Sequence, residues 1–326
     1  MDARALMSRE SIWPGYAAWR ETVLESRREF VRVARSFWLI PEIIPARSRD
    51  DIALLYRFCR QLDDAVDEAA SLDDARAAIR QQRDELAGRI EPRPHVAAFL
   101  AGARRSGLPL ECAGFLLEGM ESDLGPVRIA DDRALLQYSY RVSSAVGLML
   151  APLLGVQPGE AEARVIDLGL ALQVSNILLG VAEDARRDRV YLPAARLAEA
   201  GLAPEDVLRS PRTPRLLPVL HGLAALGDRY YQSAQDGAAL LPLRYRHGVL
   251  LLASVYRDLG WQAARGERVP AGVPLRARLH GSAALLQTAL RPRTLGLIKT
   301  PPHDPALHQP IRDLPSAHQD TARSSS

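Results

Sequence analysis

The stretch Tyr56–Glu68 reads YRFCRQLDDAVDE and has the pattern of an amphipathic helix. The apolar stripe of this helix consists of Leu55, just before the stretch, and of Cys59, Leu62 and Val66. Beside the stripe, Asp63 and Asp67 are four residues apart, so on a helix their carboxylates point the same way to within about 40°. A carboxylate pair at the edge of a core is unfavourable unless a cation compensates it. The pair therefore indicates either a cation site or a solvated acidic face, and the rest of the chain decides between them.

The composition favours an all-α protein with a mixed surface. Helix-forming residues dominate the 326 residues, and aromatic residues make up only 6%. At 47% hydrophobic, the chain can build one large core or two modest ones. The formal net charge is only +3 and is not concentrated in a long basic run, so we expect no nucleic-acid partner.

The cysteines and the N-terminal residues indicate the compartment. Cys59 and Cys112 are too few for a disulfide framework or a zinc site, and both lie in apolar helical patterns, so we expect them in the core. Residues 1–20 lack the apolar region of a signal peptide, and no segment reaches about 18 uninterrupted apolar residues. We expect a cytoplasmic protein that does not span a membrane.

Helical periodicity runs from about residue 16 to about residue 260, and no strand-type alternation lasts long enough to build a sheet. We predict an N-terminal helical extension (1–29), one main domain (30–298) and a disordered tail (299–326). Turn clusters interrupt the helical pattern at Ile44–Arg47, Glu91–Pro94, Gly125–Pro126, Gln157–Gly159 and Arg209–Pro214. The seven histidines show no metal-ligand spacing, and three of them are expected to be solvated in the tail: His303, His308 and His318.

Two helices carry polar or small residues within apolar sequence. Residues 165–179 are apolar almost all round, as in the central helix of a bundle, yet include Gln173 and Asn176. Buried amides need partners, so Asn176 either lines a site or satisfies the end of a neighbouring helix. The helix Tyr138–Pro152 has small residues that allow close helix approach or a channel beside them: Ser143, Ser144, Ala145 and Gly147.

These segments, in this order, resemble the squalene and phytoene synthase family of head-to-head prenyl synthases. The resemblance covers roughly residues 30–265, and the run Glu183–Pro193 is nearest to the phytoene synthase version found in bacteria. The matching segments are Ala34–Phe37, Tyr56–Glu68, Leu117–Leu124, Tyr138–Pro152, Gln173–Pro193 and Tyr230–Trp261.

The resemblance implies an all-α isoprenoid-synthase fold, a single helical bundle around a central active-site cavity, with residues 30–298 as the catalytic domain. It implies two acidic motifs that hold Mg²⁺, or Mn²⁺ in its place, on a prenyl diphosphate. The metal ligands that it suggests are Asp63, Asp67, Asn176 and Asp184, to which Glu183 is added below as a substitute, and the catalytic residues are Asp63, Asp67, Asp184 and Tyr138. The positions that match substrate-binding residues are Arg35, Ser36, Phe37, Tyr56, Arg60, Gln173, Asn176 and Arg189.

The second acidic motif departs from the family pattern. The family has Asn-Ile-Leu-Arg-Asp followed by an aspartate four residues on, whereas this chain has Leu179 in place of the arginine and Gly180 in place of the first aspartate. Each lost charge contact is worth roughly 1.5–3 kcal/mol even as an ordinary charged hydrogen bond, so reduced activity is expected. Glu183 lies about 20° from Asn176 on the helical projection and could act as a substitute ligand.

Three hypotheses follow from the resemblance. The first is a prenyltransferase that joins two geranylgeranyl diphosphates (1'-1) through a cyclopropylcarbinyl diphosphate to phytoene, for carotenoid biosynthesis, without NADPH. In it, Tyr138 is a candidate for relaying the proton that is lost. The second is a non-catalytic binding or assembly protein, because of Leu179 and Gly180. The third is a squalene-type or C30 synthase. Prenyl diphosphates, and downstream carotenoid enzymes, are the partners expected of the first.

Two further patterns give separate expectations. The acidic pairs Asp73-Asp74 and Asp131-Asp132 lie where helices begin and are expected to be capping residues or partners of the helix dipole there. Residues 274–299 combine arginines with leucines, which predicts peripheral contact with the inner membrane face. A last bundle helix that covers the core is the alternative for this stretch.

Overall fold

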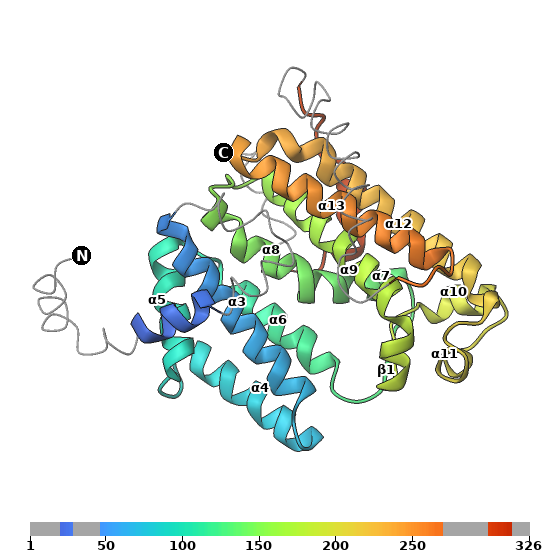
Figure 1. Cartoon of the computed structure of the whole chain (residues 1–326), viewed down its shortest axis with the longest axis horizontal. Coiled ribbons are helices and arrows are strands. Elements are labelled where there is room, and N and C mark those ends of the chain that lie inside the picture. The colour runs from blue at the N-terminus through green and yellow to red at the C-terminus, as the bar shows by residue number, and fades with distance from the viewer. Residues whose placement is uncertain (1–19, 29–45, 270–298, 315–326) are drawn as a thin grey trace, which may run out of the picture. The chain divides into compact units, whose positions relative to one another are not determined.

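The computed structural model describes residues 20–28, 46–269 and 299–314, and apart from one pair of two-residue strands its regular elements in these ranges are helices (Figure 1). Its contacts form two compact units, residues 1–110 and 111–326. The division falls inside the predicted 30–298 domain. Arg35, Ser36 and Phe37 lie outside the described residues, as does nearly all of the stretch predicted to contact a membrane.

The first unit is built from a helix over residues 20–28 and three longer helices, α3 (Ala46–Asp67), α4 (Leu72–Leu86) and α5 (Pro94–Ser106). Phe58 of α3 stacks on Phe99 of α5, with ring centroids 4.2 Å apart. Both rings are almost fully buried, so this contact anchors α3, the helix that carries the first acidic motif.

The second unit contains a long helix between shorter ones. Its strands pair in parallel, Val127 with Arg189 and Arg128 with Val190. The elements up to the long helix are α6 (Leu110–Ser122), β1 (Val127–Arg128), α7 (Asp132–Ser139), the π-helical turn η2 (Tyr140–Ser144), α8 (Ala145–Leu150), η3 (Pro152–Leu154) and α9 (Glu160–Arg186). After it come β2 (Arg189–Val190), α10 (Ala194–Glu199), α11 (Pro204–Arg209), η4 (Pro214–Leu216), α12 (Leu217–Asp236), η5 (Gly237–Leu240), α13 (Leu243–Ala264) and η6 (Pro305–Ile311).

The predicted interruptions and caps are confirmed. Each predicted turn cluster falls within a few residues of a helix end. Asp131 is the N-cap of α7, and its carboxylate accepts a hydrogen bond from the backbone N–H of Ala134 at 2.8 Å. Asp73 and Asp74 lie in the first turn of α4, which Ser71 caps. Cys112 is buried as predicted, whereas Cys59 is only half-buried.

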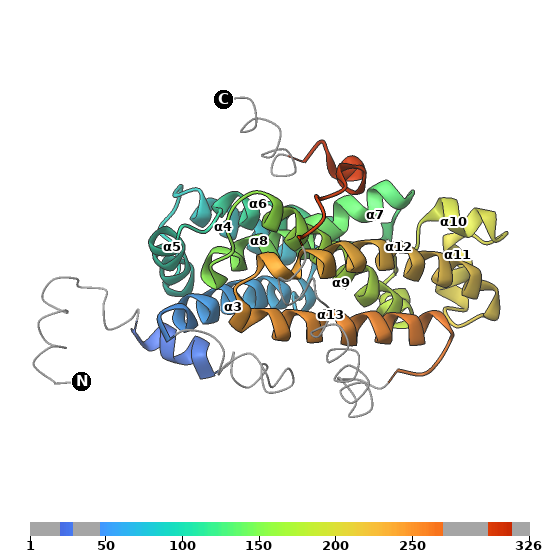
Figure 2. The same ribbon diagram turned by 90° about the horizontal axis from the view of Figure 1, so that it is seen from above.

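Helix α9 is the centre of the second unit. It packs against α12, α13, α8 and η2, and Figures 1 and 2 show α9, α12 and α13 side by side. In the described residues it is the one helix long and apolar enough to cross a membrane, but half of that stretch is buried inside the structure. Burial of this kind is typical of the central helix of a bundle, as its all-round apolar sequence predicted.

The small residues of Tyr138–Pro152 serve both of the functions that the sequence left open. Ser144 lies against α9, where its hydroxyl donates a hydrogen bond of 2.8 Å to the carbonyl of Ile166. A Cβ on Gly169 would lie 2.5 Å from the Cα of Ser144, so only glycine fits there. Ser143 and Gly147, in contrast, line a cavity that is described below.

The contact at Gly169 gives a first test. Gly169→Ala should destabilise the fold by roughly 1–3 kcal/mol, because the added methyl meets the backbone of Ser144. Gly114→Ala is the matched control, since a Cβ there meets nothing within 4 Å and alanine favours a helix over glycine by about 1 kcal/mol. Chemical denaturation of both variants measures the difference. If Gly169→Ala were as stable as Gly114→Ala, α9 and η2 would not be in close contact at this position.

The tail prediction is wrong for residues 299–314. Leu307, Ile311 and Leu314 are buried, and η6 packs against α7 (Figure 2). The hydroxyl of Tyr230 donates to the carbonyl of Leu307 at 2.9 Å. His303 is also packed rather than solvated, as is His308. Three apolar residues spaced along a short segment are enough to dock it once α7 and α9 present a surface, although they are too few to mark it as ordered in sequence.

Candidate active site

The first acidic motif lies on α3 of the first unit. Tyr56, Arg60 and Asp63 follow one another at helical spacing, and Asp67 is the last residue of the helix. A guanidinium nitrogen of Arg60 lies 2.8 Å from the carboxylate of Asp64. Although desolvation opposes it, the charges of Asp64, Tyr56 and Asp63 raise the pKa of Arg60. Helix α3 therefore presents a cation and carboxylates together, as diphosphate and its counter-ions require.

The second unit contains an apolar cavity of about 360 Å³ beside α9. Its walls come from η2, α8, α9 and α13, with side chains such as Val146, Leu168, Leu172, Val249 and Leu252. Gln173 and Asn176 of α9 also line it, and Gln173 is half-buried while Asn176 is exposed. The two amides therefore lie at the cavity and are not enclosed in the core, as their apolar surroundings in sequence had suggested. The amide nitrogen of Asn176 lies 3.5 Å from the side-chain oxygen of Gln173, so the two groups are neighbours in the wall.

The second acidic motif continues along α9. Asn176, Gly180 and Asp184 follow at four-residue spacing on one side of the helix. An oxygen of the Asp184 carboxylate lies 2.8 Å from the point that a Cβ of residue 180 would occupy. The carboxylate therefore lies over the space that Gly180 leaves open.

The Asp184 carboxyl is in an environment that disfavours its charge. Burial, opposed by the charge of Arg189 and reinforced by Asp123, raises its pKa to about 6. A carboxylate that is partly desolvated beside other acids gains strongly from a divalent cation. The donor set at this end of α9, with the carboxylate of Asp184 and the amide of Asn176, suits a hard cation such as Mg²⁺.

Asp123 is a member of this site that the sequence did not single out. It is 6% exposed and accepts hydrogen bonds from the hydroxyls of Tyr138, at 2.9 Å, and Tyr191, at 2.6 Å. The two rings stack at 4.9 Å. Burial and the Asp123 charge raise the pKa of Tyr138. Tyr138 thus holds Asp123 in place, and its hydroxyl is engaged there instead of pointing freely into the cavity.

Leu179, which replaces the arginine of the family motif, and Glu183, the suggested substitute ligand, lie in different surroundings. Leu179 packs against Val255 and Leu259 of α13, in an apolar cluster. Glu183, suggested as a substitute ligand, is exposed and forms ion pairs with Arg186 and Arg187. The apolar contact of Leu179 accounts for leucine at this position, while Glu183 would have to leave its arginine partners to bind a metal ion.

The raised pKa gives a test of the Asp184 environment. A carboxyl whose pKa is about 6 in the folded protein and about 3.8 when unfolded destabilises the folded state progressively as the pH rises through this window. In metal-free buffer, Asp184→Asn should therefore raise the midpoint of thermal unfolding at pH 8 and change it little at pH 4.5. The exposed neighbour Glu183→Gln is the control and should show no such gain. A lower midpoint for Asp184→Asn at pH 8 would contradict the assignment.

Comparisons with known proteins identify the family of this chain. The family model for squalene/phytoene synthase matches residues 30–280. The phytoene synthase of Rhodobacter capsulatus is 36% identical over 253 residues, which cover 76% of this chain and 75% of the relative. The phytoene synthase of Thermus thermophilus is 36% identical over 255 residues, which cover 72% of this chain and 86% of the relative.

Solved structures show the same fold. A dehydrosqualene synthase superposes with a TM-score of 0.71 at 22% identity, over 84% of this chain and 97% of that one. The squalene synthase HpnC of Alicyclobacillus acidocaldarius gives a TM-score of 0.64 at 21% identity, over 83% and 95%. The predicted all-α isoprenoid-synthase fold is confirmed, and the chain belongs to the squalene/phytoene synthase family.

Proposed function

We propose that this protein condenses two molecules of geranylgeranyl diphosphate head to head, through a cyclopropylcarbinyl diphosphate, to give phytoene for carotenoid synthesis. The observation that carries the proposal is the apolar cavity on α9, which has Gln173 and Asn176 in its wall and Asp184 two helical turns further on. An apolar chamber with a charged end fits a substrate that has a hydrocarbon chain and a diphosphate. The phytoene synthases among its relatives support the same reaction.

The residues divide the work between the two ends of the substrate. On α3, Arg60 supplies positive charge for diphosphate oxygens, and Asp63 and Asp67 supply carboxylates for the counter-ions. In the second unit, Arg189 and Asp184 supply the same two kinds of group. Bound Mg²⁺ would disperse the negative charge of the departing diphosphate. The cavity walls, which are mainly aliphatic, keep water from the allylic cation. Proton loss from the first condensation product needs an acceptor, and diphosphate itself is basic enough for that role. Tyr138 positions Asp123 in this scheme.

The direct test is an incubation of purified protein and Mg²⁺ with geranylgeranyl diphosphate and, separately, with farnesyl diphosphate, followed by extraction of hydrocarbons. A C40 product from the first substrate supports the proposal. A C30 product from farnesyl diphosphate, with no C40 product from geranylgeranyl diphosphate, would make the protein a C30 synthase. Binding of either diphosphate without turnover would instead favour the non-catalytic alternative, which Leu179 and Gly180 make the second candidate.

Asp63→Asn should lower product formation by roughly 100-fold or more, because removal of a charged ligand weakens both metal binding and diphosphate departure. Asp64→Asn is the matched control, since Asp64 is the next residue on α3 and is ion-paired with Arg60 instead. The initial rate of hydrocarbon formation at saturating substrate measures the effect. An Asp63→Asn protein that is as active as Asp64→Asn would refute the metal assignment.

Gly180→Asp should increase product formation by about tenfold, since a regained charge contact is worth roughly 1.5–3 kcal/mol. The Asp184 carboxylate has to turn away from the new Cβ, which its flexible side chain permits. Gly180→Asn, equal in size but uncharged, is the control and should bring no gain. Rates at several Mg²⁺ concentrations separate better metal binding from faster chemistry. If neither variant alters the rate or the Mg²⁺ dependence, this helix does not carry the second metal motif.

Leu179→Arg is expected to behave differently from Gly180→Asp. Leu179 packs against Val255 and Leu259, so an arginine there would place a guanidinium in an apolar contact between α9 and α13. The single variant should unfold at a lower temperature than the wild type, without a gain in rate. The double variant Leu179→Arg/Gly180→Asp separates the loss of stability from any gain in rate. The added arginine should improve the rate only where Gly180→Asp supplies a carboxylate for it to pair with.

A further inference from the structure

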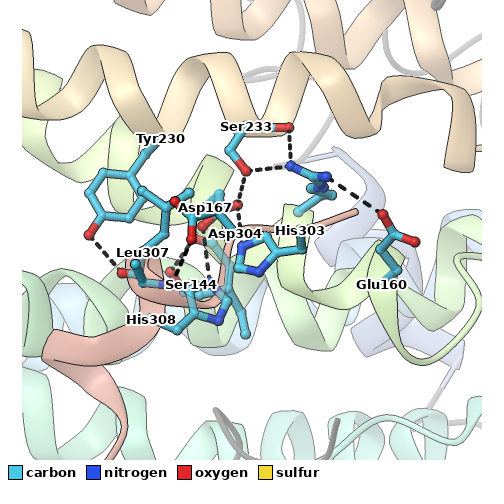
Figure 3. Close-up of polar contacts among 12 residues, drawn as sticks. Ser144, Glu160, Asp167, Tyr230, Ser233, His303, Asp304, Leu307 and His308 are labelled. Carbon is cyan, nitrogen blue, oxygen red and sulfur yellow. Dashed lines mark hydrogen bonds and ion pairs between the residues drawn. The ribbon is translucent and has the colours of Figure 1, made fainter. Parts of the chain in front are cut away.

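A buried carboxylate on α9 lies between two histidines of the C-terminal segment, residues 299–314 (Figure 3). Asp167 is fully buried. Nε2 of His303 lies 3.0 Å from one of its oxygens, and Nε2 of His308 lies 3.0 Å from the other. The hydroxyl of Ser233 donates a further hydrogen bond to the same carboxylate. Asp167, His303 and His308 do not line the cavity of the proposed active site, although Arg164 beside them does. The argument below does not depend on the proposed function.

The three side chains have the spacing of a metal site. One ligand atom from each of Asp167, His303 and His308 can be chosen so that all three lie within 4.8 Å of one another. Bonds of about 2.0–2.2 Å to a tetrahedral ion place ligand atoms roughly 3.3–3.6 Å apart, so small side-chain shifts are enough to close the site. The imidazole side chains are only 11% and 12% exposed, and their rings lie 4.3 Å apart. The ligands are therefore held together before any ion arrives.

We propose that Asp167, His303 and His308 bind one divalent transition-metal ion, Zn²⁺ in the first place, and that this ion fastens the C-terminal segment to α9. Two imidazoles and one carboxylate are a donor set that Zn²⁺ uses in proteins, with a fourth position left for water. Mg²⁺, which the proposed active site needs, prefers oxygen ligands and keeps its water, so it competes poorly here. The two sites should therefore select different metals.

The charges around the cluster are compatible with a cation. Arg164 is the nearby positive group, and its guanidinium donates to the hydroxyl of Ser233 at 2.6 Å and to the carbonyl of Pro301 at 2.6 Å. Glu160 lies 3.6 Å from this guanidinium and offsets its charge. With neutral imidazoles the group then has one net negative charge, that of Asp167. Arg164 also holds Ser233, which orients the carboxylate from the side away from the histidines (Figure 3).

Two substitutions of His308 separate a metal site from a purely hydrogen-bonded contact. His308→Gln retains a donor for the Asp167 carboxylate but replaces a strong metal ligand with a weak one. His308→Cys provides a thiolate, a strong Zn²⁺ ligand, but a poor hydrogen-bond donor. The proposal predicts that His308→Gln binds Zn²⁺ more weakly by more than about 100-fold, which exceeds the loss typical of outer-shell changes, and that His308→Cys retains binding. A hydrogen-bonded contact alone predicts that neither protein, nor the wild type, binds this ion.

The experiment uses the full chain, stripped of metal with a chelator and titrated with Zn²⁺ in excess Mg²⁺ against a fluorescent chelator of known affinity. The wild type should bind one Zn²⁺ more than His308→Gln, and Zn²⁺ should raise its unfolding temperature and slow proteolysis within residues 299–314. His247→Gln, which alters an exposed histidine of α13, should behave like the wild type. His303→Gln provides a second test if His308→Gln does not fold. Equal Zn²⁺ stoichiometry and affinity in the wild type and both glutamine variants would overturn the proposal.

Discussion

The burial of α9 is the constraint on which the second unit depends. An almost wholly apolar helix can lie at the centre of a bundle only if each polar group it carries meets a partner. Asp167 meets two histidines and Ser233, and Gln173 and Asn176 face a cavity. Asp184 remains at the end of the helix with a raised pKa. Along α9, Asp167 therefore holds the C-terminal segment, Gln173 and Asn176 line the cavity, and Asp184 forms the proposed metal site.

The replacement of two charged residues in the second acidic motif changes this site without dismantling it. Gly180 leaves open the space over which the Asp184 carboxylate leans, and Leu179 joins an apolar contact with α13. Of the two aspartates in the family's motif, only Asp184 remains, and it is close enough to Asp123 for the charge of that residue to raise its pKa. A site with one carboxylate binds cations less strongly than one with two, so we expect a lower metal affinity here than at a complete motif.

The sequence predicted most of the helical architecture, because apolar periodicity, Pro and Gly clusters and capping aspartates act over a few residues. Asp131 as the cap of α7 and the apolar α9 are examples. It failed where contacts join distant residues. His308 meets Asp167 across 141 positions, and nothing near either residue indicates the other. Asp123 belongs to a segment that resembles the family but was given no role in the site, because its partners Tyr138 and Tyr191 are brought to it only by the fold. The placement of Asp63 and Asp67 on one helix was predicted, and their binding of metal is still a prediction.

The central claim is that the C-terminal end of α9, around Asp184 and about two turns beyond the cavity wall at Asn176, binds the metal and diphosphate of a prenyl substrate. Calorimetric titration with a non-reacting thiodiphosphate analogue of geranylgeranyl diphosphate, with and without Mg²⁺ and between pH 5.5 and 8, tests it directly. The account predicts that binding requires Mg²⁺ and strengthens as the pH rises through about 6, where the Asp184 carboxyl loses its proton. Asp184→Asn should remove both the pH dependence and most of the Mg²⁺ dependence. Binding that is equally tight without Mg²⁺, or unchanged in Asp184→Asn, would contradict the account.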